Sequence, residues 1–229
     1  MLQLIDIEKS YPDGAAINYV LRRVNMTVTK GEFVAVTGES GAGKTTLLGI
    51  LGLLVVPDKG TYVLDGEDIT LPQEQSVKTS PTYDAATLRN RKIGFMFQEH
   101  LLLPQFTVMQ NILLPTLACR KTSSPEQVRY AEYLVNMTDI EGLANRLPTD
   151  ISGGEASRVA LCRALIMKPL LLLADEPTGQ LDSRNARNIV ALLKKINREL
   201  GTTVVLVSHS KETTSEAERI LTLKDGVLL

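Results

Sequence analysis

Residues 33–46 read FVAVTGESGAGKTT, and this stretch decides the fold. It contains every fixed position of the phosphate-binding loop G-x-x-x-x-G-K-[ST], namely Gly38, Gly43, Lys44 and Thr45. The apolar residues before the loop predict a buried strand, and the residues after it predict the start of a helix. Because the motif requires this order of strand, loop and helix, we expect a site for a nucleoside triphosphate rather than a chance glycine-rich turn.

The residue types of the loop suit phosphate binding. Glycines let the backbone turn its N–H groups inward, and the helix that follows adds the positive end of its dipole. We expect Lys44 to reach the β- and γ-phosphates and the Thr45 hydroxyl to ligate Mg²⁺. The nucleotide-binding residues expected here are Gly38, Ser40, Gly41, Ala42, Gly43, Lys44, Thr45 and Thr46.

Composition narrows the class of protein. The chain has 229 residues, of which 44% are hydrophobic, so it can form one large domain with a buried core. Its formal net charge of −1 provides no overall basic field to attract nucleic acid or an anionic membrane. Cys119 and Cys162 lack the spacing of metal ligands, and we expect two buried, reduced thiols. We expect no signal peptide, because residues 1–6 include an early acid, Asp6, and lack a basic start followed by an apolar block. We expect no transmembrane span, because no apolar run approaches roughly 20 residues.

Strands alternate with helices along most of the chain. Strands are expected at residues 2–7, 20–28, 33–36, 61–66, 93–97, 170–174 and 204–207. Helices are expected after residues 46, 152 and 183, and as three pieces between residues 104 and 147. We expect a turn at residues 11–14, an exposed loop at residues 71–86, and a helical turn followed by a hairpin at residues 216–229. This alternation predicts a mostly parallel sheet covered by helices, with a helical subdomain inserted.

Polar residues follow three of the predicted buried strands: Lys44-Thr45, Asp175-Glu176 and His209. Open α/β sheets bind ligands at the carboxyl ends of their strands. Asp175 suits a carboxylate that holds Mg²⁺ opposite Thr45, and Glu176 suits a base for the attacking water. Alone, the acidic pair fits a solvated turn equally well, and a single histidine at a strand end is more often not catalytic. The phosphate loop upstream favours the functional interpretation.

A second anion-binding turn is predicted at Ser152-Gly153-Gly154-Glu155. Ser152 with Glu155 three residues later forms the pattern of a capping box at a helix start. The two glycines leave the first N–H groups of that helix accessible to an anion. Because one nucleotide does not need two such turns from one chain, we expect this turn to face the γ-phosphate of a nucleotide held by a second copy.

As a set, these motifs resemble those of the ATP-binding subunits of ABC transporters over essentially the whole chain. The phosphate loop is similar to the Walker A motif, residues 170–175 to Walker B, and residues 151–155 to the ABC signature. The resemblance implies that Tyr11 stacks on adenine, although a tyrosine in a turn otherwise indicates surface packing. It implies catalytic roles for Glu176, His209 and Gln98, metal contacts from Thr45, Gln98 and Asp175, and nucleotide contacts from Ser152, Gly153, Gly154, Glu155 and Asp182.

The resemblance also implies an α/β fold. A RecA-like P-loop NTPase core would surround a mostly parallel sheet, with an N-terminal antiparallel β-subdomain and an inserted α-helical subdomain. Residues 1–229 would form a single ABC-type ATP-binding domain, with its core at residues 1–98 and 166–229 and its helical subdomain at residues 99–165.

Residues 174–179, Phe97-Gln98 and residues 101–104 are similar to the branch that serves lipoprotein release, macrolide efflux, antimicrobial-peptide resistance and cell division. That branch implies ATP and Mg²⁺ as cofactors. It implies a second copy of the chain and membrane permease subunits with extracytoplasmic domains as partners, no nucleic acid, and a peripheral place at the cytoplasmic face of the cell membrane.

Several departures from the family pattern leave the substrate subgroup open. Residues 155–158 read EASR in place of a run rich in Gln or Glu before the arginine. Gln180 stands where Asn is usual, and Ser210 follows His209 where Asp is frequent. The loop at residues 71–86 is also longer than usual. None of these departures removes a residue expected to be catalytic.

The expected function is an ATP-hydrolysing subunit that dimerises head to tail and powers a separate permease. A soluble ABC-type ATPase acting on DNA or ribosomes would usually carry a coiled-coil insertion or a second phosphate loop, and this sequence has neither. An ABC ATPase that controls cell-envelope or division machinery without transport is compatible with all the motifs.

Overall fold

The fold contains two β-sheets. The structure is a computed structural model, and it describes residues 1–14, 16–70, 84–118 and 122–229. The smaller sheet is antiparallel and contains, in order, β2 (Ala16–Val28), β1 (Leu2–Asp13), β4 (Lys59–Leu64) and β5 (Glu67–Asp68). The larger sheet contains β10 (Val227–Leu228), β9 (Arg219–Lys224), β3 (Phe33–Thr37), β8 (Thr203–Val207), β7 (Leu171–Asp175) and β6 (Ile93–Met96). All its neighbouring strands are parallel except β9 and β10. The predicted α/β fold, with a mostly parallel sheet and an N-terminal antiparallel β-subdomain, is confirmed.

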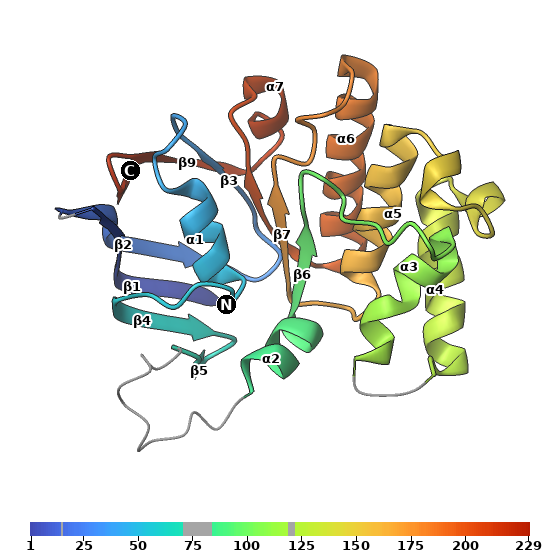
Figure 1. Cartoon of the computed structure of the whole chain (residues 1–229), viewed down its shortest axis with the longest axis horizontal. Coiled ribbons are helices and arrows are strands. Elements are labelled where there is room, and N and C mark those ends of the chain that lie inside the picture. The colour runs from blue at the N-terminus through green and yellow to red at the C-terminus, as the bar shows by residue number, and fades with distance from the viewer. Residues whose placement is uncertain (15, 71–83, 119–121) are drawn as a thin grey trace.

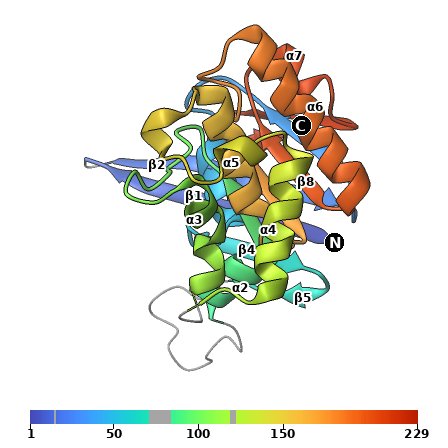
Figure 2. The same ribbon diagram turned by 90° about the vertical axis from the view of Figure 1, so that its right-hand side faces the viewer.

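The helices lie on both sides of the larger sheet. They are α1 (Lys44–Leu51), α2 (Ala85–Lys92), α3 (Val108–Leu113), α4 (Pro125–Met137), α5 (Gly153–Leu165), α6 (Ser183–Leu200) and α7 (Lys211–Thr214), with short 3-10 turns η1 (Leu114–Leu117), η2 (Glu141–Leu143) and η3 (Pro148–Asp150). Helix α1 lies between the two sheets, whereas α3, α4, α5 and α6 gather on the opposite side (Figure 1). Figure 2 faces this helical side. Among the described helices, none combines the length and the apolarity needed to cross a bilayer.

Strand β3 separates two apolar clusters, because side chains alternate between the faces of a strand. Val34 and Val36 belong to a cluster with α1, β1 and β2, which we call the β-side cluster. Phe33 and Ala35 belong to a cluster with α3, α4, α5 and α6, which we call the helical-side cluster. The run of apolar residues in β3 is therefore explained by burial on both faces.

The structure corrects three predicted boundaries. Tyr11 lies in β1 and pairs with Asn18 of β2, so the turn expected at residues 11–14 occurs only from Gly14, whose φ is 59°. Helix α2 begins at Ala85, inside the region predicted as a loop, and residues 71–83 of that loop lie outside the described residues. The last helical turn is α7, which precedes the predicted residues 216–229, whereas the hairpin of β9 and β10 is confirmed.

The cysteine prediction is confirmed for one of the two residues. Cys162 is a free thiol with no exposed surface, and burial raises its pKa to about 12. Its Sγ lies 3.2 Å from the Thr138 hydroxyl. Cys119 lies outside the described residues.

Candidate functional site

The phosphate loop connects β3 to α1, and three glycines set its shape. Gly38, Gly41 and Gly43 have φ angles of 157°, 80° and 100°, which residues with a Cβ rarely adopt. A Cβ on Gly38 would overlap the carbonyl of Leu223, and one on Gly43 would lie 2.8 Å from the carbonyl oxygen of Val20. Gly41 has open space at the same position. Two glycines are thus required by close packing behind the loop, and the third leaves the loop open to a ligand.

The first turn of α1 is open to an anion. No side chain caps this helix, whose N-cap is Gly43, whereas Ser, Thr or Asp side chains cap α2 to α6. The N–H groups of its first turn are therefore left for a ligand. The Lys44 Nζ donates to the carbonyl oxygens of Gly38 (2.8 Å) and Glu39 (2.7 Å), so the ammonium lies across the loop. This nest of N–H groups and one cation fits the phosphates of a nucleotide.

A cavity of about 340 Å³ brings most of the predicted catalytic and metal-binding residues together. Its lining includes Ser40, Gly41, Gly43, Lys44, Thr45, Thr46, Gln98, Asp175 and Glu176. These residues follow the carboxyl ends of β3, β6 and β7. Because these strands are parallel, their carboxyl ends lie along the same side of the larger sheet. The structure thus assembles one site from residues more than a hundred positions apart. This agrees with the expectation that polar residues after the buried strands meet at the carboxyl ends of the sheet.

Asp175 ends β7 and is half-buried in this cavity. Its pKa is raised by burial and by the neighbouring charge of Glu176, while the Lys44 ammonium opposes the shift. A carboxylate and the hydroxyl of Thr45 in one cavity are oxygen ligands of the kind that Mg²⁺ prefers beside phosphate groups. The residues present therefore fit Mg²⁺ at this position.

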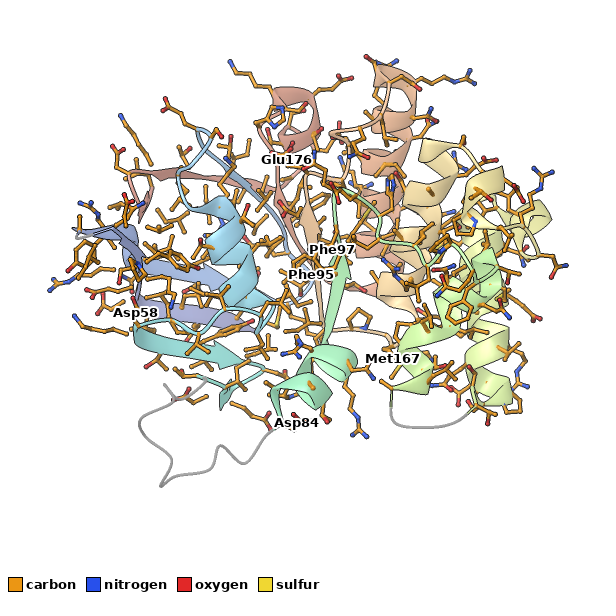
Figure 3. The ribbon with its side chains drawn as sticks, in the orientation of Figure 1. Asp58, Asp84, Phe95, Phe97, Met167 and Glu176 are labelled. Atoms are coloured by element: carbon orange, nitrogen blue, oxygen red, sulfur yellow. The ribbon has the colours of Figure 1, made fainter. Side chains whose placement is uncertain are left out.

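Gln98 enters the cavity from the end of β6. The rings of Phe95 and Phe97 stack just before it, with centroids 4.1 Å apart (Figure 3). The Gln98 Nε2 would lie 3.1 Å from a Cβ on Gly179, so a glycine at that position leaves room for the amide. Gly179 follows Glu176 in the turn after β7, where its N–H donates to the Glu176 carbonyl oxygen (3.0 Å).

Glu176 is held in place by its neighbours at the end of β8. Its carboxylate accepts hydrogen bonds from the Ser208 hydroxyl (3.1 Å) and the His209 backbone N–H (3.1 Å), and it lies 2.8 Å from the His209 Nδ1. Its φ of 43° is unusual for a residue with a side chain, and such strain gathers at functional sites. Figure 3 places Glu176 at the end of the molecule where the phosphate loop lies. A carboxylate fixed beside the cavity can orient a water and accept its proton.

The predicted capping box at the start of α5 is confirmed. The Ser152 N–H donates to the Glu155 carboxylate (2.7 Å), and the Glu155 N–H donates to the Ser152 hydroxyl (3.4 Å). Ser152 and Gly153 are exposed. Within the described chain, this turn is not part of the cavity that contains Lys44.

The start of α6 packs against this turn. A Cβ on Gly154 would lie 2.8 Å from the Asn185 Oδ1, so the close approach of the two helices requires a glycine. Asp182 caps α6 and accepts hydrogen bonds from the backbone of Arg184 (2.9 Å) and Asn185 (3.0 Å) and from the Asn185 amide (2.6 Å). In a single chain Asp182 is therefore a helix cap, and its predicted contact with a nucleotide stays a prediction.

The structure does not bring Tyr11 into the cavity with Lys44. The ring is exposed on β1, and the Lys9 Nζ lies 5.3 Å from its centroid. A second cavity of about 540 Å³ on the outer side of the phosphate loop is lined by Asn18, Tyr19 and Val20 of β2 together with residues 38–42 and 222–226. The sequence analysis did not predict that Tyr19 lines a cavity with the phosphate loop. The signal available was a second aromatic residue in the same hairpin as Tyr11. Ser208, which holds Glu176, was not predicted either.

Comparison with known proteins identifies the family. The family model described as "ABC transporter" matches residues 21–179. The chain belongs to the ABC transporter family. This ABC ATPase is 42% identical to the lipoprotein-releasing system ATP-binding protein LolD 1 of Rhodopirellula baltica, over 100% of this chain and 96% of that protein. It is 39% identical to the macrolide export ATP-binding/permease protein MacB of the same organism, over 100% of this chain but 32% of that protein.

Solved structures give the same relationship. The dimeric structure of MJ0796, a bacterial ABC transporter cassette, is 38% identical and superimposes with a TM-score of 0.86, over 100% of this chain and 96% of that one. A post-hydrolysis state of MJ0796 bound to ADP and phosphate has a TM-score of 0.85 at the same identity and coverage. The predicted P-loop fold, ATP hydrolysis and resemblance to the lipoprotein-release and macrolide-efflux branch are confirmed.

Proposed function

We propose that two copies of this ABC ATPase, arranged head to tail, hydrolyse ATP and power a separate membrane permease. The observation that carries the proposal is the separation of two anion-binding features within one chain. The phosphate loop shares a cavity with Asp175 and Glu176, whereas the Ser152 turn begins α5 outside that cavity. A two-fold axis would place Ser152 of each copy over the phosphate loop of the other and complete two equal sites.

Within each site, we assign a role to each residue from its place in the cavity. The Lys44 ammonium and the N–H groups of α1 would bind the phosphates, and Thr45 and Asp175 would hold Mg²⁺, with Gln98 lining the same cavity. Bound Mg²⁺ would supply positive charge that stabilises the developing charge on the phosphates. Glu176, fixed by Ser208 and His209, orients the attacking water and takes its proton. Tyr19 lines a cavity with residues of the phosphate loop, where we expect the base to extend, and Tyr11 lies on the same hairpin.

The permease would dock at the groove between α2 and α5. A cavity of about 360 Å³ there is lined by apolar residues and by Arg89 and Arg163. Leu101 and Leu103 are exposed in the loop after Gln98, with exposed fractions of 51% and 38%. Apolar and basic side chains together fit an amphipathic cytoplasmic segment that carries acidic residues. The ATPase would then sit as a peripheral protein at the cytoplasmic face of the cell membrane, with permease subunits that have extracytoplasmic domains.

The relatives favour lipoprotein release or macrolide-type efflux as the process that is powered. Control of cell-envelope or division machinery without transport would use the same ATPase dimer. Only the identity of the membrane partner distinguishes that function from lipoprotein release or efflux. Purifying the tagged ATPase with its native membrane complex would identify the permease and decide between these functions. Recovery of a DNA- or ribosome-bound complex without a permease would contradict the proposal.

Cross-linking tests the docking groove directly. Single cysteines at the exposed Glu99 and Gln105 should cross-link to the permease in membranes, because both flank the exposed leucines. A cysteine at the exposed Asp65, in the turn between β4 and β5, serves as the matched control and should give no cross-link. An assembled complex in which neither Glu99 nor Gln105 can be cross-linked would rule out this groove.

A further inference from the structure

Ser157 occupies one of the positions where the sequence departs from the family pattern. Its side chain lies on α5, one turn after Gly153, and has no exposed surface. The Ser157 hydroxyl donates to the Gly153 carbonyl oxygen (3.0 Å) and lies 2.7 Å from the His100 Nε2. A hydroxyl carries one proton, and a carbonyl oxygen can only accept. With that proton on the Gly153 carbonyl, the Ser157 hydroxyl accepts from His100 in the tautomer that carries a proton on Nε2.

Arg163 attaches the same loop to α5 at a second point. Its guanidinium donates to the carbonyl oxygens of His100 (2.5 Å) and Leu101 (2.6 Å). Among the described residues, no carboxylate forms an ion pair with Arg163, so its donors serve the loop. Ser157 and Arg163 are separated by about 9 Å along the helix axis at about 1.5 Å per residue. His100 is thus fixed to one helix through its side chain and through its backbone.

The backbone of this loop is strained where it is attached. His100 and Leu101 have φ angles of 55° and 48°, the left-handed region that side chains disfavour. Two such residues in succession persist only where surrounding contacts hold them. The contacts from Ser157 and Arg163 supply that support two residues after Gln98, which lines the catalytic cavity.

We propose that His100 and Ser157 are positioning residues that tie Gln98 to the Ser152 turn of the same chain. A shift of Gln98 toward a bound nucleotide would then move the first turn of α5, through His100, Ser157 and the Gly153 carbonyl. ATP in one site would in this way adjust the anion-binding turn that the chain presents to its partner. The inference rests on the proposed shared site.

Two substitutions of His100 distinguish the effect of losing the hydrogen bond to Ser157 from the effect of losing the imidazole ring. His100→Gln places an amide N–H near the position of Nε2 and keeps the donor, whereas His100→Asn is too short to reach Ser157. Both variants, with Ser157→Ala and the double variant His100→Asn/Ser157→Ala, are made in a Glu176→Gln background. Sedimentation with ATP and Mg²⁺ measures dimerisation, and a fluorescent ATP analogue measures nucleotide affinity.

His100→Asn and Ser157→Ala should each weaken ATP-driven dimerisation roughly 3- to 10-fold, the effect of one hydrogen bond. Nucleotide affinity should stay unchanged. The double variant should be no worse than Ser157→Ala, because that substitution already removes the contact with His100 together with the bond to Gly153. His100→Gln should dimerise as the parent does. Ser123→Ala is the matched control, since it removes a hydroxyl contact of 2.6 Å with Thr116 that does not lead to Gln98.

The same substitutions in the wild-type background give a second readout from the assembled complex. In the complex, the kcat of His100→Asn and of Ser157→Ala should fall severalfold with an unchanged KM for ATP. His100→Gln should keep the wild-type kcat. Parent-like dimerisation and kcat in His100→Asn, or additive losses in the double variant, would overturn the inference. A Glu176→Gln parent that does not dimerise would instead count against the proposed shared site, and kcat in the complex would still decide the role of His100.

Discussion

Replacing Glu176 with glutamine should separate ATP binding from hydrolysis. The carboxylate is a poor candidate for holding phosphate, because it is bound by Ser208 and His209 and lies beside the cavity rather than in the loop. It is well placed to act on water. Loss of a positioned general base slows a reaction by about 10²- to 10⁴-fold, which corresponds to roughly 3 to 5 kcal/mol in the barrier.

The cost to stability should be much smaller. Glutamine keeps one oxygen to accept from His209, and its NH₂ group can donate to the Ser208 hydroxyl in place of the bond that the carboxylate accepted. What is lost is the charge assistance of these hydrogen bonds, worth about 1 kcal/mol. For a chain of this size that is a change of about 2–4 °C in Tm. The change in rate should therefore exceed by far any effect of altered folding.

Three measurements on purified protein test this prediction: phosphate release with ATP and Mg²⁺, affinity for a fluorescent ATP analogue, and Tm. Glu212→Gln is the matched control, because it removes the same charge from an exposed carboxylate that pairs with Arg187 at 3.2 Å on α6. It should leave turnover unchanged. Lys44→Ala should instead weaken nucleotide binding. Wild-type turnover in Glu176→Gln, or a loss of ATP binding as large as that in Lys44→Ala, would refute the assigned role.

Asp175→Asn should raise the Tm of the nucleotide-free protein at pH 7. Burial raises the pKa of the native carboxyl, so its ionisation costs stability as the pH rises past the ordinary pKa of an aspartate; a lower Tm by calorimetry would contradict this. Gly154→Trp should abolish ATP-driven dimerisation while each monomer still binds ATP, since Asn185 lies 2.8 Å from the Cβ position; a dimer in sedimentation would exclude the shared site. In a Cys119→Ser background, Cys162 should resist alkylation at pH 8 until the protein is denatured, because burial raises its pKa to about 12; rapid labelling of native protein in mass spectrometry would show that its cluster opens.

Buried strands and capped helices were predictable because their signals are local. Strand β7 lies between two helical layers and appears as an unbroken apolar run, and the capping box of α5 needs only Ser152 and Glu155. Helix α2 was missed because Leu88 is its one buried residue, so it has no apolar period. Its start is marked only by Asp84, which accepts from the N–H groups of Ala86 and Thr87.

Contacts between distant residues were not predictable, since they depend on the order of strands in the sheet. The sequence shows that Glu176 and His209 follow buried strands, but only the adjacency of β7 and β8 brings the two side chains together. The contact of His100 with Ser157 spans 57 positions, and Ser157 lies where the sequence departs from the family pattern, so no motif indicated the contact. Tyr11 shows the opposite case, because turn residues suggested a reversal where the β1–β2 hairpin continues.

The larger sheet separates two apolar clusters that have no side chain in common among the described residues. Alternate residues of β3 belong to one cluster or the other, so an opening on one side of the sheet exposes a different set of side chains from an opening on the other. We expect amide protons of α3 and α4 to exchange with solvent through a partial opening of the helical side, while those of β1, β2 and α1 stay protected. Such an opening leaves the backbone of the phosphate loop folded. Repacking of α3 and α4 would therefore leave the phosphate loop in place and reach the nucleotide site only through α5, Ser157, His100 and Gln98.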